Sequence, residues 1–193
     1  MQSDSFSDPR FTYGEYRLWQ GDERWELIDG EAYLMSPAPT RRHQKASVGL
    51  VGQIENHLVG HTCQVYAAPF DVRLPDGDEE DDAVTTVVQP DLAVICDPSK
   101  LDDAGCRGAP DWVVEILSPS TSARDRVEKR NLYDRHGVRE YWVLDPENGE
   151  LTVHQRSAGA ASFDVAWSGG ARERKGPGLL PDLRLEWGRI LEV

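Results

Sequence analysis

Apolar and polar positions along the chain follow two repeats, one typical of strands and one typical of helices. Residues 25–35 hold two apolar runs joined by Asp29-Gly30, a dipeptide that strongly favours a tight β-hairpin. Residues 41–59 instead repeat apolar positions at helical spacing, with Thr40 suited to cap the start and Gly60 to follow the end. The N-terminal part is therefore predicted to be a hairpin followed by a long helix.

The middle and C-terminal parts of the chain are predicted to be mostly strand. The expected strands are residues 64–74, 87–96, 112–117, 140–144, 151–155 and 163–167. A second helix is expected at about 121–136, ended by Gly137. This order predicts an α/β (α+β) fold in which a central mixed β-sheet is flanked by helices and extended by the N-terminal hairpin. We expect a single domain over residues 11–193, preceded by a flexible N-terminus at 1–10.

The chain is strongly acidic, because 34 Asp and Glu residues outnumber 21 Lys and Arg residues and give a formal charge of −13. The overall field of such a protein does not attract nucleic acid, so any nucleic-acid role depends on a local site. Residues 76–82 hold many of the acidic side chains and are expected to form a solvated loop. Local positive charge is available in two clusters: Arg41, Arg42 and Lys45, and then Arg124, Arg126, Lys129, Arg130 and Arg135.

Neither a targeting segment nor a membrane span is expected. Residues 1–10 are polar and lack the apolar core of a secretory signal, and no run approaches the roughly 20 apolar residues that cross a bilayer. The three cysteines, Cys63, Cys96 and Cys106, show no paired spacing. We therefore expect a cytoplasmic protein without membrane contact, whose cysteines are reduced and act as small buried hydrophobic residues.

Two carboxylates interrupt otherwise apolar strands. Asp91 follows Pro90 within the strand at 87–96, and Glu115 lies inside the strand at 112–117. An ionised carboxylate in a buried strand is costly unless it is paired or bound to a metal. If the two strands are neighbours, both carboxylates can point at one place, where Mg²⁺ would relieve their repulsion. The alternative is a pair of strand-end carboxylates that accept hydrogen bonds from backbone N–H groups or arginine.

Three further residues are candidates for the same site. Lys129 lies on the predicted second helix, from which its ammonium can reach back toward Glu115; the alternative is an ion pair with Asp125, four residues earlier. Glu31 closes the hairpin and is a candidate third acidic residue, or else an exposed hairpin carboxylate. His43, in the first turn of the long helix, is a site candidate or a locally bonded histidine.

Other hydrolase motifs are missing or incomplete. His57 and His61 have the outer spacing of the zinc-protease motif H-E-x-x-H, but Leu58 stands where the glutamate is needed. The sequence contains neither a G-x-S-x-G nucleophile elbow nor a phosphate-binding G-x-x-x-x-G-K-[ST] loop. A metalloprotease, a serine hydrolase of this type and a P-loop nucleotidase are therefore not predicted.

Taken together, these segments resemble the Uma2 family, a group within the PD-(D/E)XK nuclease superfamily. The resemblance covers about residues 11–190 and runs through segments 25–31 (WELIDGE), 35–39, 42–43, 68–74, 88–92, 108–111, 114–121, 128–129 and 137–143. It implies a restriction-endonuclease-like core of helix, three-stranded meander, helix and strand, which matches the order predicted above for residues 41–145. It also implies hydrolysis of phosphodiester bonds with Mg²⁺, or Mn²⁺ in its place.

The resemblance assigns roles to individual residues. Pro90-Asp91 matches the "PD" and Glu115 the "(D/E)" of the superfamily motif, so Asp91, Glu115 and the carbonyl of Ile116 would hold the metal. The motif then expects a lysine at position 117, where this chain has Leu117. The resemblance favours Lys129 as the displaced lysine. Glu31 and His43 are further catalytic candidates.

The sequence therefore predicts a Mg²⁺-dependent endonuclease that acts on DNA. One alternative is a binding or interaction module that keeps the fold without catalysis, with Leu117 marking the loss. Another is a hydrolase of small nucleotide-like phosphoesters, which needs no large basic surface. A homodimer is expected only because two-fold dimers are common among soluble proteins.

Overall fold

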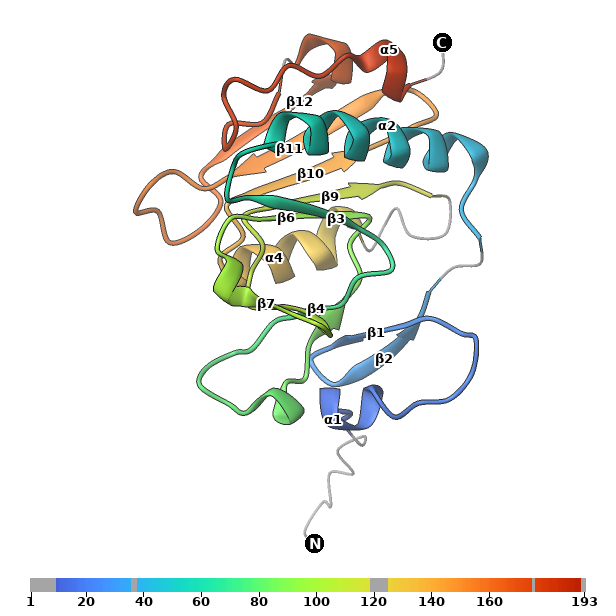
Figure 1. The fold of residues 1–193 in the computed structure, drawn as a ribbon, viewed down its shortest axis with the longest axis vertical. Coiled ribbons are helices and arrows are strands. Elements are labelled where there is room, and N and C mark those ends of the chain that lie inside the picture. Colours follow the sequence, from blue (N-terminus) through green and yellow to red (C-terminus); the bar gives the residue numbers. More distant parts are fainter. Residues whose placement is uncertain (1–9, 36–37, 119–124, 175, 192–193) are drawn as a thin grey trace, which may run out of the picture.

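A computed structural model describes residues 10–35, 38–118, 125–174 and 176–191. Its strands form two six-stranded mixed sheets, one above the other in Figure 1, with helices flanking the upper sheet. We call the lower one sheet A, with strand order β2-β1-β5-β4-β8-β7, and the upper one sheet B, with order β12-β11-β10-β9-β6-β3. The predicted α+β class with mixed sheet and flanking helices is confirmed.

Sheet B is the larger layer and contains the apolar strands. It is built from β3 (Gln64–Ala67), β6 (Leu92–Ile95), β9 (Trp112–Ile116), β10 (Glu140–Leu144), β11 (Glu150–Gln155) and β12 (Val165–Gly170). Only β9 and β10 run parallel among the described pairs of this sheet. Every residue of β9 and β10 is buried, as expected for strands covered on both faces.

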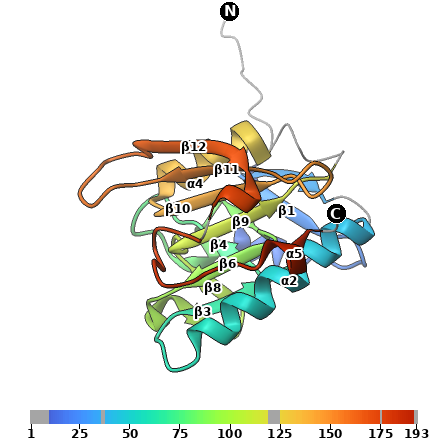
Figure 2. The same ribbon diagram turned by 90° about the horizontal axis from the view of Figure 1, so that it is seen from above.

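Helices cover both faces of sheet B. Figure 2 shows α2 (Arg41–Leu58) and α4 (Arg130–His136) on opposite sides of the sheet, with the short α5 (Trp187–Ile190) beside α2. The buried face of α2 presents Leu50 and Ile54 to one core, while Leu132 and Tyr133 of α4 contribute to the other. The predicted cap of α2 is confirmed, because the Thr40 hydroxyl accepts a hydrogen bond from the His43 backbone N–H. No helix among the described residues is both long enough and apolar enough to span a membrane.

Sheet A is assembled from short strands. They are β1 (Trp25–Ile28), β2 (Glu31–Leu34), β4 (Val72–Arg73), β5 (Val87–Val88), β7 (Leu101–Asp102) and β8 (Gly105–Arg107), accompanied by α1 (Tyr13–Tyr16), η1 (Asp81–Ala83) and η2 (Pro98–Lys100). The predicted hairpin is confirmed as β1–β2. Its turn residues, Asp29 and Gly30, have φ values of 52° and 82°, the left-handed conformation that this dipeptide tolerates.

Two strands that the sequence predicted as continuous are each split between the two sheets. Residues 64–74 form β3 in sheet B and β4 in sheet A, and residues 87–96 form β5 in sheet A and β6 in sheet B. Pro69 and Pro90 lie in the two breaks, where the lack of an N–H prevents a continuous ladder. Within each of these two segments the chain passes from one sheet to the other, and the Ala68 N–H donates to the Asp91 carbonyl (3.1 Å) where the two passages meet.

The predicted second helix is confirmed in its described part only, because residues 119–124 lie outside the described residues. Residues Asp125–Lys129 form a turn of π-helix, η3, which leads directly into α4. Gly137, with a φ of 90°, ends α4 as predicted. Near the C-terminus, η4 (Ala171–Glu173) follows β12, and residues 176–191 return to pack beside α2.

The expectation of three reduced cysteines is wrong for two of them. Cys63 and Cys96 form a disulfide, whereas Cys106 is free and buried. The physical reason is register: Gln64 pairs with Ile95 in the β3–β6 ladder, so Cys63 and Cys96 are the next opposed positions. This opposition comes from strand pairing, which cysteine spacing alone does not reveal.

Candidate active site

Asp91 lies where the chain passes from β5 in sheet A to β6 in sheet B. Leu92 pairs with Val114 in the antiparallel β6–β9 ladder, so Asp91 stands opposite Glu115. The Asp91 N–H is 3.4 Å from Glu115 Oε2, and Asp91 Oδ2 accepts a hydrogen bond from the Ile116 N–H (2.7 Å). The two acidic strands are neighbours, which is the condition that the sequence analysis set for the two carboxylates to point at one place.

Glu115 is almost fully buried, with 3% of its surface exposed. Its Oε1 atom accepts hydrogen bonds from Lys129 Nζ (3.0 Å) and from the Tyr133 hydroxyl (2.9 Å). These two donors hold one carboxylate oxygen on the α4 side. The other oxygen, Oε2, is the one that lies toward Asp91.

Lys129 ends the π-helical turn before α4 and points into the protein, with 4% of its surface exposed. Its ammonium lies between two carboxylates, 3.0 Å from Glu115 Oε1 and 2.9 Å from Glu26 Oε1. Leu117, at the strand position where the motif expects lysine, packs in the core cluster beneath α4. The amine thus reaches Glu115 from the helix. The alternative partner, Asp125, has a side chain outside the described residues.

Glu26 of β1 joins this cluster, and the sequence analysis did not select it. It is 2% exposed, and its Oε1 atom accepts a hydrogen bond from the Gln89 N–H (2.9 Å) as well as contacting Lys129. Sequence offered one signal, namely that Glu26 interrupts an apolar run as Asp91 and Glu115 do. Glu26 belongs to the site because its face of the hairpin is buried, and this face is buried because sheet A packs against α4.

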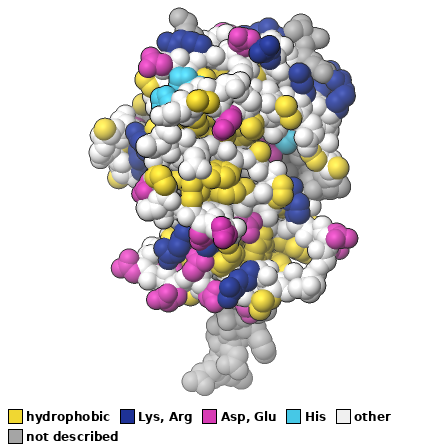
Figure 3. All heavy atoms as spheres, in the orientation of Figure 1, with side chains coloured by type: hydrophobic (Ala, Val, Ile, Leu, Met, Phe, Trp, Pro, Cys, Tyr) yellow, Lys and Arg dark blue, Asp and Glu magenta, His cyan; other side chains and the backbone are white. Residues whose placement is uncertain are grey.

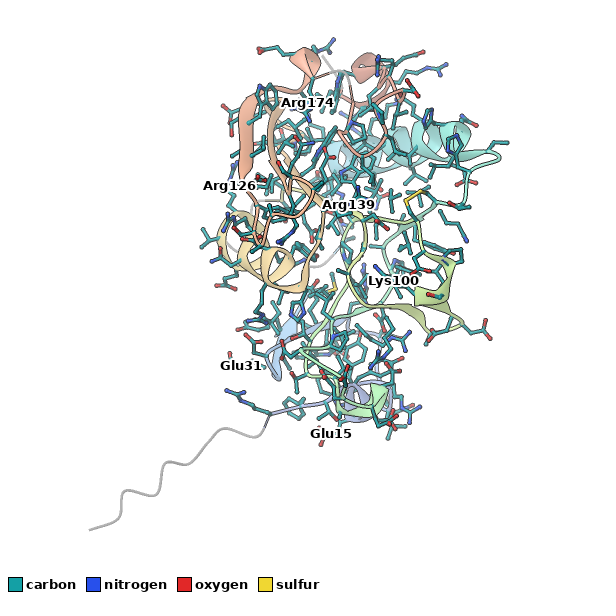
Figure 4. All side chains as sticks on the ribbon, turned by 90° about the vertical axis from the view of Figure 1, so that its left-hand side faces the viewer. Glu15, Glu31, Lys100, Arg126, Arg139 and Arg174 are labelled. Atoms are coloured by element: carbon teal, nitrogen blue, oxygen red, sulfur yellow. A yellow bond between two sulfur atoms is a disulfide. The ribbon has the colours of Figure 1, made fainter. Side chains whose placement is uncertain are left out.

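The expectation that Glu31 is the third acidic residue of the site is not met by its placement. Glu31 pairs with Ile28 at the turn end of the hairpin, whereas Glu26 pairs with Tyr33 toward the open end. Glu31 is exposed, its carboxylate accepts a hydrogen bond from the Tyr33 hydroxyl (2.9 Å), and Figure 4 shows it at the outer edge of the hairpin. Strand geometry explains the difference. Glu31 lies opposite Ile28, two residues along β1 from Glu26, and two residues along a strand separate side chains by about 7 Å.

His43 reaches the site from the opposite face of sheet B. It lies in the first turn of α2, is 8% exposed, and places Nε2 3.1 Å from Asp91 Oδ2. Asp91 Oδ2 is therefore held by His43 and by the Ile116 N–H together. Asp91, Glu115, Lys129 and His43 are brought together by the fold, and their chemical roles stay predictions.

The described residues of this cluster include more acidic than basic side chains. Of the residues that the structure describes here, Glu26, Asp91 and Glu115 contribute carboxylates and Lys129 contributes an ammonium. Burial raises the pKa of Tyr133 well above its ordinary value, and the charges of Glu115 and Glu26 raise it further, so its hydroxyl stays a donor. A divalent cation would offset this excess of carboxylates among the described residues.

The donor set fits Mg²⁺ better than a transition metal. Within the described residues, no group of three His, Cys, Asp or Glu side chains is arranged as a metal-binding cluster. Mg²⁺ needs fewer protein ligands, since it is commonly held by one or two carboxylates with water and phosphate oxygens. Asp91 and Glu115 meet that requirement. The Ile116 N–H is engaged with Asp91, and a role for the Ile116 carbonyl stays a prediction.

Charge is unevenly distributed over the surface. Figure 3 shows Asp and Glu crowded over sheet A in the lower part of the view, and Lys and Arg gathered at the upper right, where α2 begins. Arg41, Arg42 and Lys45, within two residues of His43 at the start of α2, are exposed, and Arg42 pairs with Glu147 (2.8 Å). Of the second cluster, Arg126 and Arg135 are exposed, while Arg124 lies outside the described residues.

Three comparisons describe what this chain is similar to. The sequence profile of the Uma2 family, described as "putative restriction endonuclease", matches residues 13–187. The uncharacterized protein slr1290 of Synechocystis sp. is 28% identical over 152 residues, which cover 77% of this chain and 76% of that protein. The crystal structure of a "putative nuclease belonging to DUF820" from Anabaena variabilis superposes with a TM-score of 0.70 at 17% identity, covering 91% of this chain and 94% of that one. The structural match shows a shared fold.

Proposed function

Because the chain belongs to the Uma2 family, we propose that it is a divalent-metal-dependent endonuclease that hydrolyses phosphodiester bonds of DNA. The observation that supports this most is the convergence of Asp91, Glu115 and Lys129. Two carboxylates from adjacent strands and one buried amine meet where the two sheets join. Such a set suits metal-assisted attack on a phosphate group.

Each side chain has a distinct part in this proposal. Asp91, Glu115 and the carbonyl of Ile116 would hold Mg²⁺, which when bound would supply Lewis-acid stabilisation of the charge that develops on the phosphate. Lys129 would offset negative charge at the same place and orient the attacking water. His43 would keep Asp91 in position through its 3.1 Å contact.

DNA has to approach a protein of formal charge −13, so the approach must be local. The exposed Arg41, Arg42 and Lys45 at the start of α2 offer positive charge beside His43. Contacts of this kind make binding fall steeply as salt rises. A steep salt dependence is therefore expected for DNA cleavage, and a shallow one for small nucleotide substrates.

The test is cleavage of plasmid and single-stranded DNA in Mg²⁺, Mn²⁺ or EDTA. Cleavage should require the metal and should be lost in Asp91→Ala and in Glu115→Ala. Glu140→Gln, which alters a buried carboxylate at the start of β10 and away from the site, should still cleave DNA. Unchanged cleavage in Asp91→Ala would overturn the proposal, as would turnover of nucleotides without turnover of DNA. Calorimetry without Mg²⁺ or Mn²⁺ binding would favour a non-catalytic binding module.

A further inference from the structure

Glu26 belongs to sheet A, whereas Glu115 belongs to β9 of sheet B and Asp91 immediately precedes β6 of that sheet. One oxygen of Glu26, Oε1, lies 2.9 Å from Lys129 Nζ and 2.9 Å from the Gln89 backbone nitrogen. Gln89 is two residues before Asp91 in the same chain segment. A single atom thus contacts both the amine of the site and the backbone that carries Asp91.

Among the described side chains of its own turn, Lys129 is the one that enters the protein interior. Arg126, Val127 and Glu128, the other described side chains of this π-helical turn, are all exposed, while Lys129 alone is buried. A lysine stem has four flexible bonds, and its point charge goes where the carboxylates hold it. Glu26 and Glu115 approach the ammonium at nearly equal distances, 2.9 and 3.0 Å, so neither binds it exclusively.

If Glu26 served only to fill space in the core, an apolar side chain at this position would be more favourable for folding. The Glu26 side chain is 2% exposed, and burying a carboxylate is unfavourable compared with an apolar side chain of similar size. Its neighbour on the same face of β1, Ile28, packs against the α4-side core as an ordinary apolar residue. The buried carboxylate of Glu26 is compensated by the Lys129 ammonium and by the Gln89 N–H, and of these two the ammonium is the charged partner.

We propose that Glu26 is a positioning residue, which holds the Lys129 amine at a fixed place relative to Asp91 and Glu115 and so couples sheet A to the catalytic site. This inference rests on the proposed nuclease function. Glu26 acts through Lys129 and does not itself contact the substrate. Removing its charge leaves Glu115 as the one carboxylate described beside the amine, and the amine shifts toward it.

The first test compares Glu26→Gln with Glu140→Gln. Glu140 is a matched control, because it is also 2% exposed and accepts hydrogen bonds from Trp142 Nε1 and from the Gly178 and Leu179 N–H groups, away from the site. In Glu26→Gln, kcat on DNA should fall about 10- to 100-fold, the range typical of outer partners of active-site groups, with KM within about two-fold. Glu140→Gln should keep kcat even if both variants lose stability in urea.

A double-mutant cycle with Lys129→Met then asks whether Glu26 acts through the amine. Once Lys129 is gone, adding Glu26→Gln should leave kcat within about two-fold of the single variant, because the two residues act as a unit. A further loss of ten-fold or more in the double variant would overturn the proposal, since Glu26 would then act independently of Lys129.

A second measurement needs no activity. Native protein is treated briefly with acetic anhydride, and acetylation of Lys129 is quantified by mass spectrometry in the wild type, Glu26→Gln and Glu140→Gln. Lys129 should react several-fold faster in Glu26→Gln than in the wild type or Glu140→Gln, because its ammonium has lost one of the two carboxylates described beside it. Equal rates in all three proteins would overturn the positioning role. A rise in labelling with no metal-dependent cleavage in the wild type would support the positioning of Lys129 while rejecting the nuclease function.

Discussion

Lys129 and Arg73 are both buried cations held between two carboxylates, and they differ in how those carboxylates meet water. Arg73 of β4 is 1% exposed and bonds Asp102 through two 2.7 Å contacts and Asp81 through one of 2.5 Å. The side chains of Asp81 and Asp102 are 37% and 51% exposed. Those of Glu26 and Glu115 around Lys129 are only 3% and 4% exposed.

The two groups also differ in charge balance. Arg107 joins the Arg73 group by approaching Asp81 (3.3 Å), so that two cations face two anions. At the Lys129 group, the described residues are one ammonium, the carboxylates of Glu26 and Glu115, and the nearby carboxylate of Asp91. Ion pairs with equal numbers of cations and anions and with solvent-exposed carboxylates, as around Arg73, hold sheet A together. A buried cluster with more carboxylates than cations is typical of a functional site.

The largest expected effect comes from removing each cation. Lys129→Met leaves buried carboxylates without their counter-charge and should cost about 3–5 kcal/mol of unfolding free energy. Arg73→Met leaves carboxylates that water already reaches, and should cost less, about 1.5–3 kcal/mol. Urea unfolding of both variants in EDTA measures the difference. A greater loss in Arg73→Met would break the comparison.

A divalent metal should distinguish the two groups next. At a Mn²⁺ concentration of 100 times its Kd, the wild type and Arg73→Met should each gain about 2.7 kcal/mol of stability. Asp91→Asn should lose this gain, yet keep its metal-free stability, because an amide oxygen can still accept from the Ile116 N–H. Thermal melts with MnCl₂ or EDTA provide the measurement. A large metal-free loss in Asp91→Asn would mean that Asp91 is structural.

Each cation group includes a tyrosine, which permits a smaller, matched test. Tyr133→Phe removes a hydroxyl that donates to Glu115 and should cost about 0.5–1.5 kcal/mol. Tyr13→Phe keeps the aromatic ring, whose centroid lies 5.1 Å from Arg73 Cζ, and should hardly change the free energy of unfolding. Urea unfolding supplies both values, and equal losses would contradict the assignment of the Tyr133 hydroxyl to Glu115.

The smallest effect expected is a pH dependence at the Arg73 group. Burial acts to raise the pKa of Asp102, but hydrogen bonds from Arg73 and nearby backbone outweigh it and lower that pKa below its ordinary value. The resulting stability is complete above the unfolded-state pKa of about 3.9 and is lost as pH falls through the lower folded value. Because Asp102 is half exposed, we expect under about 1 kcal/mol. In Arg73→Met, the unfolding free energy measured in urea should depend less on pH at pH 5 and below.

Sequence patterns predicted the parts of the fold that depend on local chemistry. Asp29-Gly30 marked the hairpin, Thr40 marked the start of α2, and an apolar run broken by Glu115 alone marked β9. They did not predict the splitting of residues 64–74, because Phe70, Val72 and Leu74 continue the same alternation after the chain has left sheet B. Periodicity identifies a strand and its faces but not the sheet that it joins.

The candidate site was predictable to the same degree. Asp91 and Glu115 stand out because each interrupts an apolar strand, and the pairing of β6 with β9 brings them together. Glu26 carries a similar local pattern in a hairpin whose other glutamate, Glu31, is exposed. Which of the two is buried depends on the packing of the hairpin against α4, a contact between residues about a hundred positions apart in sequence, as in the Lys129–Glu26 pair.

The Cys63–Cys96 bond has a consequence for the open border of sheet B. It lies immediately beyond the last pair of the β3–β6 ladder, and β3 is an edge strand with one neighbour. A slip of one residue would exchange Val65, which packs on the α2 side, with Tyr66, which packs on the α4 side. Edge strands are the ones most exposed to fraying and to recruitment by strands of other molecules. The cross-link prevents such slippage covalently, so this border does not depend on its hydrogen bonds alone to stay in register.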